Sequence, residues 1–167
     1  MYNGETSQCF NLNLTDQSEV DGIERIMMAY KNAIKAVDLS RPTLFSPVIR
    51  KTIQYIDLDG QNNYHILLII TDGQITDEDA TKQAIVEASV LPLSIVIVGV
   101  GNADFSSMGR LDGDDNPLFD NTGKRIRDIV QFVQYNMKYA LNPSMFSRDL
   151  LQEIPGQVER YFKSIGQ

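Results

Sequence analysis

The chain has 167 residues, a net charge of −7 and a hydrophobic content of 43%. This length suits one domain with a sizeable core, and the composition is that of an ordinary globular protein. The acidic balance argues against broad nucleic-acid binding and against a purely electrostatic membrane anchor. The sequence has no apolar run of the roughly 20 residues that span a bilayer and no signal-peptide pattern at its start. Cys9, the single cysteine, cannot form an internal disulfide, so we expect a reducing cytosolic setting.

The first third of the chain predicts an edge strand and two helices. Residues 9–14 alternate apolar with polar side chains, which is the period of a half-exposed strand. A helix should start at Ser18, with a buried face made of Val20, Ile23, Ile26, Met27, Tyr30, Ile34 and Val37. A second helix should have Ser46 as its N-cap and Pro47 as its first residue, because the missing N–H of proline costs nothing there. Its apolar stripe should be Val48, Ile49, Ile53 and Ile56.

Three later segments have the character of parallel strands. Residues 64–71 form a continuous apolar run, which is typical of a strand buried on both faces. A helix over residues 76–89 separates this run from a second one, residues 93–100, and predicts a right-handed βαβ crossover. Residues 128–133 should form a third strand. The sequence therefore predicts an α/β fold in which helices cover a parallel sheet.

The C-terminal tail, residues 144–165, should be helical and should be broken or kinked at Pro155. Its predicted buried face consists of Leu150, Leu151, Ile154, Val158, Tyr161, Phe162 and Ile165. No internal repeat or low-complexity linker interrupts the sequence, so we expect residues 1–167 to form one domain.

Two motifs resemble ligand-binding loops but depart from them. Residues 99–101 begin like a dinucleotide fingerprint, yet Asp104 stands where the third glycine belongs, so turning from strand to loop explains them better. The loop from Asp112 to Asp115 begins like a calcium-binding EF loop, but its sixth position is Pro117 and its twelfth is Gly123. We expect a solvated acidic loop there, with weak calcium binding as the alternative.

Asp72 is the best-placed candidate for chemistry. It follows the first buried run, and parallel sheets bind ligands outside the carboxyl ends of their strands. A carboxylate with hydroxyl groups is an oxygen ligand set for Mg²⁺. Thr71, Thr43 and Ser46 could supply the hydroxyls if residues 41–47 fold beside the strand end. The alternative is that Asp72 caps a turn, where Asp and Gly are favoured in any case.

Several of these stretches resemble the copine family. They are residues 69–73, 85–105, 111–114 and 127–133, together with Pro42-Thr43, Phe45–Ile49 and Glu153–Val158. The resemblance covers nearly the whole chain. Copines carry two calcium-dependent phospholipid-binding modules followed by a von Willebrand factor A-type domain, and this chain is similar to the latter part of that domain.

The resemblance implies a three-layer, doubly wound, Rossmann-like α/β fold, with residues 1–167 as a partial von Willebrand factor A-type domain. It also implies a metal-ion-dependent adhesion site for Mg²⁺ or Mn²⁺, in which Thr43 and Asp72 match two of three elements. The rim of that site, where a partner would bind, would consist of Thr71, Gly73, Gln74 and Ser46. The third element is an Asp-x-Ser-x-Ser-like turn, which the family places before Cys9 with its first strand, first helix and second strand. We therefore expect metal binding by this chain to be weak or absent.

These implications favour an intracellular protein-interaction module without enzymatic activity or nucleic-acid partners. We expect a cytoplasmic location, with the parent protein recruited to membranes through lipid-binding domains that lie outside this chain. Two alternatives stay open: a metal-dependent phosphoryl-transfer or hydrolytic enzyme that uses Asp72, and an inactive truncated domain. The sequence offers no nucleophile–base pair and no phosphate-cradling loop, which weighs against the enzyme.

Overall fold

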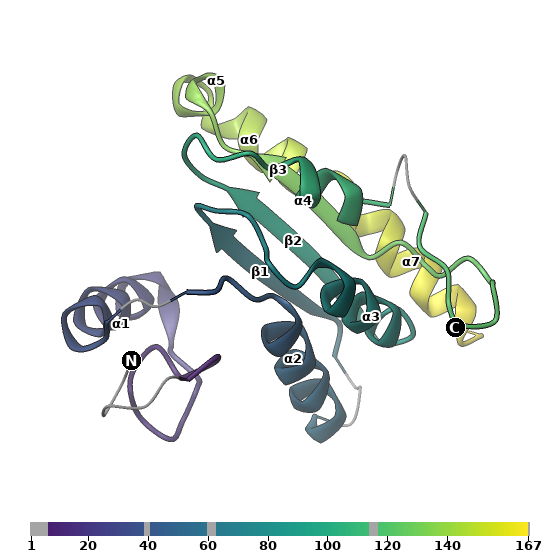
Figure 1. The fold of residues 1–167 in the computed structure, drawn as a ribbon, viewed down its shortest axis with the longest axis horizontal. Helices are drawn as coiled ribbons and strands as arrows, with labels where there is room; N and C mark the ends of the chain where they lie inside the picture. Colours follow the sequence, from purple (N-terminus) through teal and green to yellow (C-terminus); the bar gives the residue numbers. More distant parts are fainter. Residues whose placement is uncertain (1–6, 39–40, 60–62, 114–116, 167) are drawn as a thin grey trace. The chain divides into compact units, whose positions relative to one another are not determined.

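The computed structural model describes residues 7–38, 41–59, 63–113 and 117–166. The chain divides into two compact units, residues 1–42 and residues 43–167. The second unit contains the parallel sheet and the helices that pack on it (Figure 1). No helix in these described ranges combines the length and the apolar character that a membrane span needs.

The first unit contains α1 (Gly22–Ala36), which confirms the predicted helix with Asp21 rather than Ser18 as the residue before it. The predicted buried face is wrong, because Ala29 and Ala33 are the buried residues of α1. The larger apolar side chains are 41–70% exposed, namely Ile23, Ile26, Met27, Tyr30 and Ile34. A unit of about 40 residues is too small to bury an apolar stripe of this length within its own core.

The predicted strand at residues 9–14 is also wrong, because this segment forms turns. The Leu14 N–H donates to the carbonyl oxygen of Asn11, and the Asn11 side-chain amide donates to the carbonyl oxygen of Thr15. The Asn13 amide binds the carbonyl oxygen of Gln17 in the same way. Asparagine side chains that bond to nearby backbone compete with a strand ladder, and here they prevail over the alternating pattern.

The sheet consists of β1 (His65–Thr71), β2 (Leu93–Gly99) and β3 (Val130–Gln134), all parallel and in that order (Figure 1). The helix α3 (Glu78–Ala88) connects β1 to β2, which confirms the predicted crossover unit. The register places Ile69 opposite Ile97, and Ile97 opposite Phe132. β2 is central and buried along its whole length.

One face of the sheet is covered by α2 (Ser46–Leu58), α3 and the short helix α4 (Ser106–Leu111), which the sequence did not predict. The predicted stripe of α2 is confirmed, since Ile49 and Ile56 are buried and Val48 and Ile53 are half-buried. The core on this face joins side chains from these helices and from alternate positions of β2: Phe45, Ile49, Ile56, Ala84, Ile85, Ala88, Leu93, Ile95, Ile97, Met108 and Leu111.

The other face carries the C-terminal helices, α5 (Met137–Leu141), α6 (Pro143–Leu151) and α7 (Ile154–Ser164). The predicted break is confirmed, because α6 and α7 are separate helices and Pro155 lies in the first turn of α7. Tyr161 of the predicted buried face is buried, whereas Leu151 and Ile165 are 48% and 50% exposed. α7 packs against β2, and α6 packs against β3.

β1 is not buried on both faces, so that part of the prediction is wrong. Ile66, Leu68 and Ile70 are 52%, 52% and 66% exposed, while Leu67 and Ile69 pack against the core. The register aligns the exposed residues with Ser94, Val96 and Val98, which lie under the C-terminal helices. β1 lies at the edge of the described sheet, beyond the cover that α7 gives to β2. The unit is therefore three layers deep at β2 and two at β1.

Candidate metal and partner-binding site

The predicted site residues lie where β1 ends. Asp72 is exposed, and Thr71 before it is buried. The Thr71 hydroxyl donates to the carbonyl oxygen of Gly73 at 3.2 Å, and the Gly73 N–H approaches the same hydroxyl oxygen at 3.4 Å. Thr71 therefore closes the turn that presents Asp72, and its hydroxyl is already engaged.

The loop that carries Thr43 is hydrogen-bonded to Thr76, in the segment that follows Asp72. The Thr76 N–H and the Thr76 hydroxyl both donate to the carbonyl oxygen of Thr43, each at 3.0 Å. Thr43 itself is exposed. The two segments are 33 residues apart in the sequence and are joined by these paired hydrogen bonds.

Asp77, the residue after Thr76, also holds this loop. Its carboxylate accepts hydrogen bonds from the N–H groups of Phe45 (3.1 Å) and Ser46 (2.9 Å), at the beginning of α2. Burial would raise the pKa of Asp77, but hydrogen bonds from the Ser46 hydroxyl and from these N–H groups outweigh it and lower the pKa. A carboxylate at a helix N-terminus also interacts favourably with the positive end of the helix dipole. Ser46 is thus bound to Asp77 and buried, which removes its hydroxyl from the predicted rim.

The loop after β2 brings a second carboxylate to this edge of the sheet. Asp104 accepts a hydrogen bond from the Ser106 N–H at 2.9 Å. This bond, followed by one from the Ser106 hydroxyl, lowers the pKa of Asp104, and the Gln74 amide adds a smaller contribution in the same direction. Gln74 therefore connects the turn after β1 with the loop after β2.

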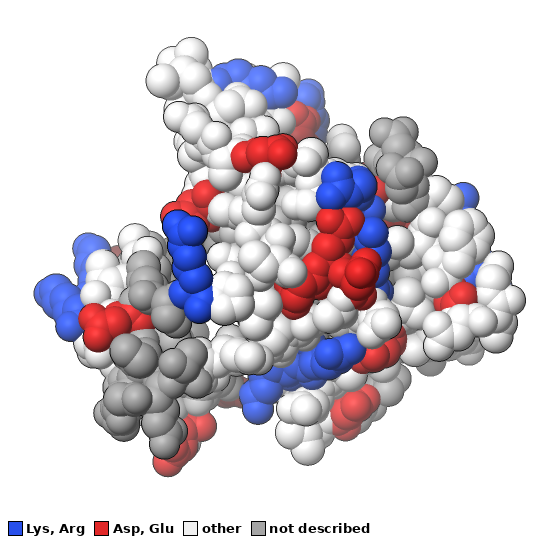
Figure 2. Space-filling model, in the orientation of Figure 1, with Lys and Arg blue, Asp and Glu red and all other residues white. Residues whose placement is uncertain are grey.

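An ion-pair network lies next to this edge, over α3 and α4. Glu78 pairs with Arg110 at 2.7 Å and with Lys82 at 2.8 Å. Hydrogen bonds from Arg110 and then Lys82 lower the pKa of Glu78 to about 2. Acidic and basic side chains meet over these helices in Figure 2. This network joins the first turn of α3 to the last turn of α4.

The donors at this edge fit Mg²⁺ or Mn²⁺ in kind, because carboxylate and hydroxyl oxygens are the ligands that these hard cations prefer. Asp72 supplies a carboxylate and Thr43 an exposed hydroxyl. Within the described ranges, Asp72 does not belong to a group of three acidic, histidine or cysteine side chains close enough to share an ion. Mg²⁺ usually needs more anionic ligands than one carboxylate. The chemical type of these ligands therefore fits the ion, but their number is low.

The two motifs that resemble ligand-binding loops have structural roles. An added Cβ at Gly99 would lie 3.0 Å from the Phe105 ring, and Gly101 has a φ of +88°, so packing and turning account for both glycines. In the acidic loop, Asp114, Asp115 and Asn116 lie outside the described residues. Asp112 accepts a hydrogen bond from the Phe132 N–H, which ties the loop to β3.

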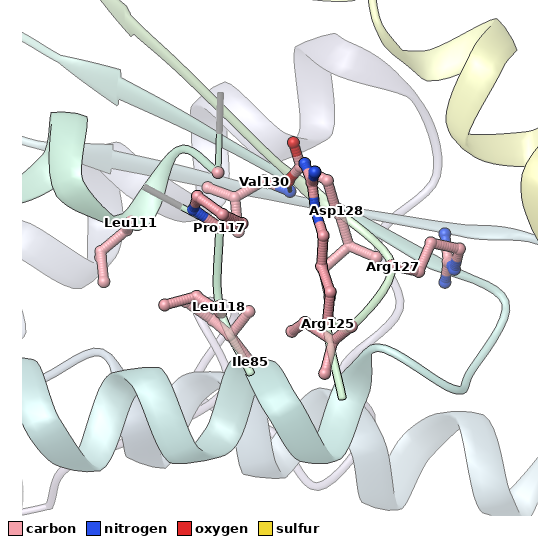
Figure 3. Close-up of a pocket in the computed structure, with 11 residues that line it drawn as sticks. Ile85, Leu111, Pro117, Leu118, Arg125, Arg127, Asp128 and Val130 are labelled. Carbon is pink, nitrogen blue, oxygen red and sulfur yellow. Dashed lines mark hydrogen bonds between the residues drawn. The ribbon is translucent and has the colours of Figure 1, made fainter. Parts of the chain in front are cut away.

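A small cavity of about 10 Å³ lies between Gly113, Pro117 and Leu118 on one side and the segment before β3 on the other (Figure 3). Its wall includes Ile85, Leu111 and Leu118, and its volume is about that of one water probe. The cavity is therefore a packing gap and not a ligand pocket.

The fold and the candidate site together define an α/β domain with a parallel sheet, in which oxygen-bearing loops meet at the carboxyl ends of the strands. The copine family profile matches residues 2–166, and the chain belongs to the copine family. The chain is 45% identical to Copine-C of Dictyostelium discoideum over 170 residues, which cover 99% of this chain and 31% of that protein. It is 46% identical to Protein BONZAI 1 of Arabidopsis thaliana over 164 residues, or 94% of this chain and 28% of that protein. The chain thus spans about a third of the length of these curated relatives.

Proposed function

We propose that this chain acts as an intracellular protein-interaction module of the von Willebrand factor A type. In this proposal the carboxyl edge of the parallel sheet is the docking surface, and Asp72 and Thr43 bind Mg²⁺ or Mn²⁺ there. Thr71, Gly73 and Gln74 form the rim, while Ser46 holds the loop in place through Asp77. A carboxylate of the partner protein would complete the coordination of the ion.

One observation carries this proposal: the paired hydrogen bonds from Thr76 to the Thr43 carbonyl oxygen. They hold the Thr43 loop against the segment that follows Asp72, although the two are far apart in the sequence. The Asp77 carboxylate adds two further bonds to the same loop. Hydrogen bonds hold both the Thr43 loop and the turn that carries Asp72, and oxygen donors held in this way are a preorganised start for a metal site.

The alternative of a phosphoryl-transfer or hydrolytic enzyme would need groups that converge on Asp72. Such chemistry requires a nucleophile with a base, or several ligands that hold a metal and a phosphate. Two of the candidate hydroxyls are already engaged, since Thr71 bonds to Gly73 and Ser46 bonds to Asp77. The geometry therefore favours binding over turnover.

The proposal is tested by Mn²⁺-induced broadening of amide signals in the NMR spectrum, which detects weak metal sites. We expect broadening to concentrate at the amides of Thr43 and of residues 71–73, because a paramagnetic ion acts over short distances. Asp72→Ala should abolish this local broadening with little change in the fold, since Asp72 is exposed. Asp79→Ala, which removes an exposed carboxylate from α3, is the matched control and should keep it.

Mg²⁺ should compete with Mn²⁺ for the same signals, and titration calorimetry should show weak binding, because one carboxylate and one hydroxyl are few ligands. Tight binding that persists in Asp72→Ala would overturn the assignment. Broadening centred on Asp112, Asp128 and Glu153 would move the metal site to that acidic group, whose carboxylates lie within 4.8 Å of one another.

A further inference from the structure

A groove of about 690 Å³ lies at the end of the sheet opposite Asp72. Its walls come from the C-terminal end of α3, the segment from Asp120 to Arg127, and the last turns of α7. The α3 wall directly precedes β2 and the second segment precedes β3, so the groove lies at the amino ends of these strands. It shares no residue with the proposed metal site.

The charge of this groove has the opposite sign to that of the whole chain. Lys124, Arg125, Arg127 and Arg160 line it with a single carboxylate, Asp120, which leaves an excess of three positive charges. The whole chain has a net charge of −7. The Asp120 carboxylate accepts hydrogen bonds from Thr122 and from the Lys124 N–H, within its own turn. A concentration of cations in an acidic chain favours an anionic ligand.

The four cations have two different roles. Arg127 donates to the carbonyl oxygens of Leu91 (2.6 Å), Ser89 (3.1 Å) and Leu93 (3.3 Å), and its guanidinium lies 5.4 Å from the centre of the Tyr161 ring. These contacts fix Arg127 as part of the wall. Lys124, Arg125 and Arg160 are exposed. Arg160 also borders a neighbouring hollow that Asp128 and Glu153 line.

Apolar side chains lie among these cations. Val90 is 74% exposed and Ile165 is 50% exposed, while Val86 and Ile126 are half-buried beneath them. Single exposed apolar residues are common on protein surfaces. Here they come from different segments and share one groove with three exposed cations, so the surface offers apolar and ionic contacts together.

We infer that this groove binds an acidic amphipathic peptide segment of a partner protein. Carboxylates of the peptide would contact Lys124, Arg125 and Arg160, and an apolar side chain between them would pack on Val90 and Ile165. The concave shape suits a peptide better than a flat bilayer. The acidic net charge of the chain also opposes approach to an anionic membrane surface. This contact does not depend on a metal ion.

The test is a selection of binding peptides from a random display library on the immobilised full chain, with EDTA present to exclude metal-dependent binding. Enriched peptides are then measured by fluorescence anisotropy against wild type and two double variants. Lys124→Glu/Arg160→Glu reverses the charge at two positions of the groove. Lys35→Glu/Lys51→Glu is the matched control at exposed sites outside the groove. Both variants change the net charge by the same amount, and thermal melting checks that both fold.

We expect the selected peptides to combine acidic and apolar residues. Their affinity should fall by about tenfold or more in the groove variant and by less than about twofold in the control, because the charge contacts are local. Equal affinity for wild type and the groove variant would overturn the inference, as would selected peptides without acidic residues or no peptide binding above background. Binding of vesicles of equal parts phosphatidylserine and phosphatidylcholine that is lost in the groove variant, without peptide binding, would assign the groove to a membrane.

Discussion

β1 and β2 differ in environment although their sequences predict the same kind of strand. Both are strands of seven residues with mostly apolar side chains, and they pair along their full length. β2 is buried at every position, whereas β1 exposes Ile66, Leu68 and Ile70 on one face. An apolar run shows that a strand is suited to burial on both faces, but the elements that pack on it decide whether it is buried.

The exposed face of β1 therefore has a composition that fits a covered position. A strand that regularly faced water on one side would alternate apolar with polar residues. β1 also carries no charge, proline or bulge of the kind that protects an exposed edge strand. We infer that this face and edge are regions where another segment or chain can pack.

The largest expected effect separates the two strands directly. Ile97→Ala in β2 should reduce the free energy of unfolding by about 2–5 kcal/mol, because the side chain is fully buried between two strands. Leu68→Ala in β1 should cost about 1 kcal/mol or less, because Leu68 is half exposed. Urea unfolding measures both. Equal losses would show that the outer face of β1 is covered in solution.

A somewhat smaller effect is expected at the amino ends of the strands. Arg127 donates to the Tyr64 hydroxyl as well as to the carbonyl oxygens of Leu91 and Leu93, so it connects the beginnings of β1 and β2. Arg127→Met should cost about 2–4 kcal/mol, because several partly buried acceptors lose their donor. Arg148→Met is the control, and it should change stability by less than about 0.5 kcal/mol because Arg148 is 68% exposed. A similar, small loss in both variants would contradict the anchoring role of Arg127.

In the part of the chain that the structure describes, no strand pairs with the outer edge of β1, and this predicts self-association. An unpaired, uncharged strand edge is a template for pairing with another chain. We expect the chain to form dimers or larger species as concentration rises in analytical ultracentrifugation, and Leu68→Lys to suppress them. Leu58→Lys, at a site on α2 that is 88% exposed, should not. A wild-type chain that stays monomeric at high concentration and melts cooperatively would show that this edge is protected.

The smallest effect concerns the salt bridges beside the candidate site. The pKa of Glu78 is lowered from 4.5 to about 2, so its ion pairs contribute stability above about pH 4.5, and this contribution is lost as the pH falls towards 2. Solvent screening limits it to about 1 kcal/mol or less, since the partner side chains of Arg110 and Lys82 are 49% and 34% exposed. Glu78→Gln should lower stability at pH 7 by that amount and leave it unchanged at pH 2. A loss of the same size at both pH values would exclude the ion pairs as its cause.

The sequence was most informative where a pattern is local and strong. The apolar run of β2, the crossover through α3 and the break at Pro155 follow from periodicity and from the lost N–H of proline. It was least informative in the first unit. The amphipathic period of α1 identified a helix but not which side would be covered, and the asparagines at positions 11 and 13 turned a predicted strand into turns.

The candidate site was predictable in part for the same reason. The position of Asp72 after β1 follows from the strand pattern, and the structure places it there. No sequence pattern indicates that Asp77 binds the N-terminus of α2, because this contact joins residues 32 positions apart. The engagement of Ser46 by Asp77, which withdraws it from the predicted rim, could not be foreseen either.

The hydrogen bonds from Phe45 and Ser46 to Asp77 have a consequence for local unfolding of the domain. The amide hydrogens of Phe45 and Ser46 have an acceptor only while the segment after β1 is docked on the start of α2. Their exchange with deuterated water therefore reports local undocking of the Thr43 loop, separately from unfolding of the sheet. Amides at the centre of β2 should exchange only through global unfolding. The difference between the two exchange rates measures how often the two sides of the candidate site come apart in an otherwise folded molecule.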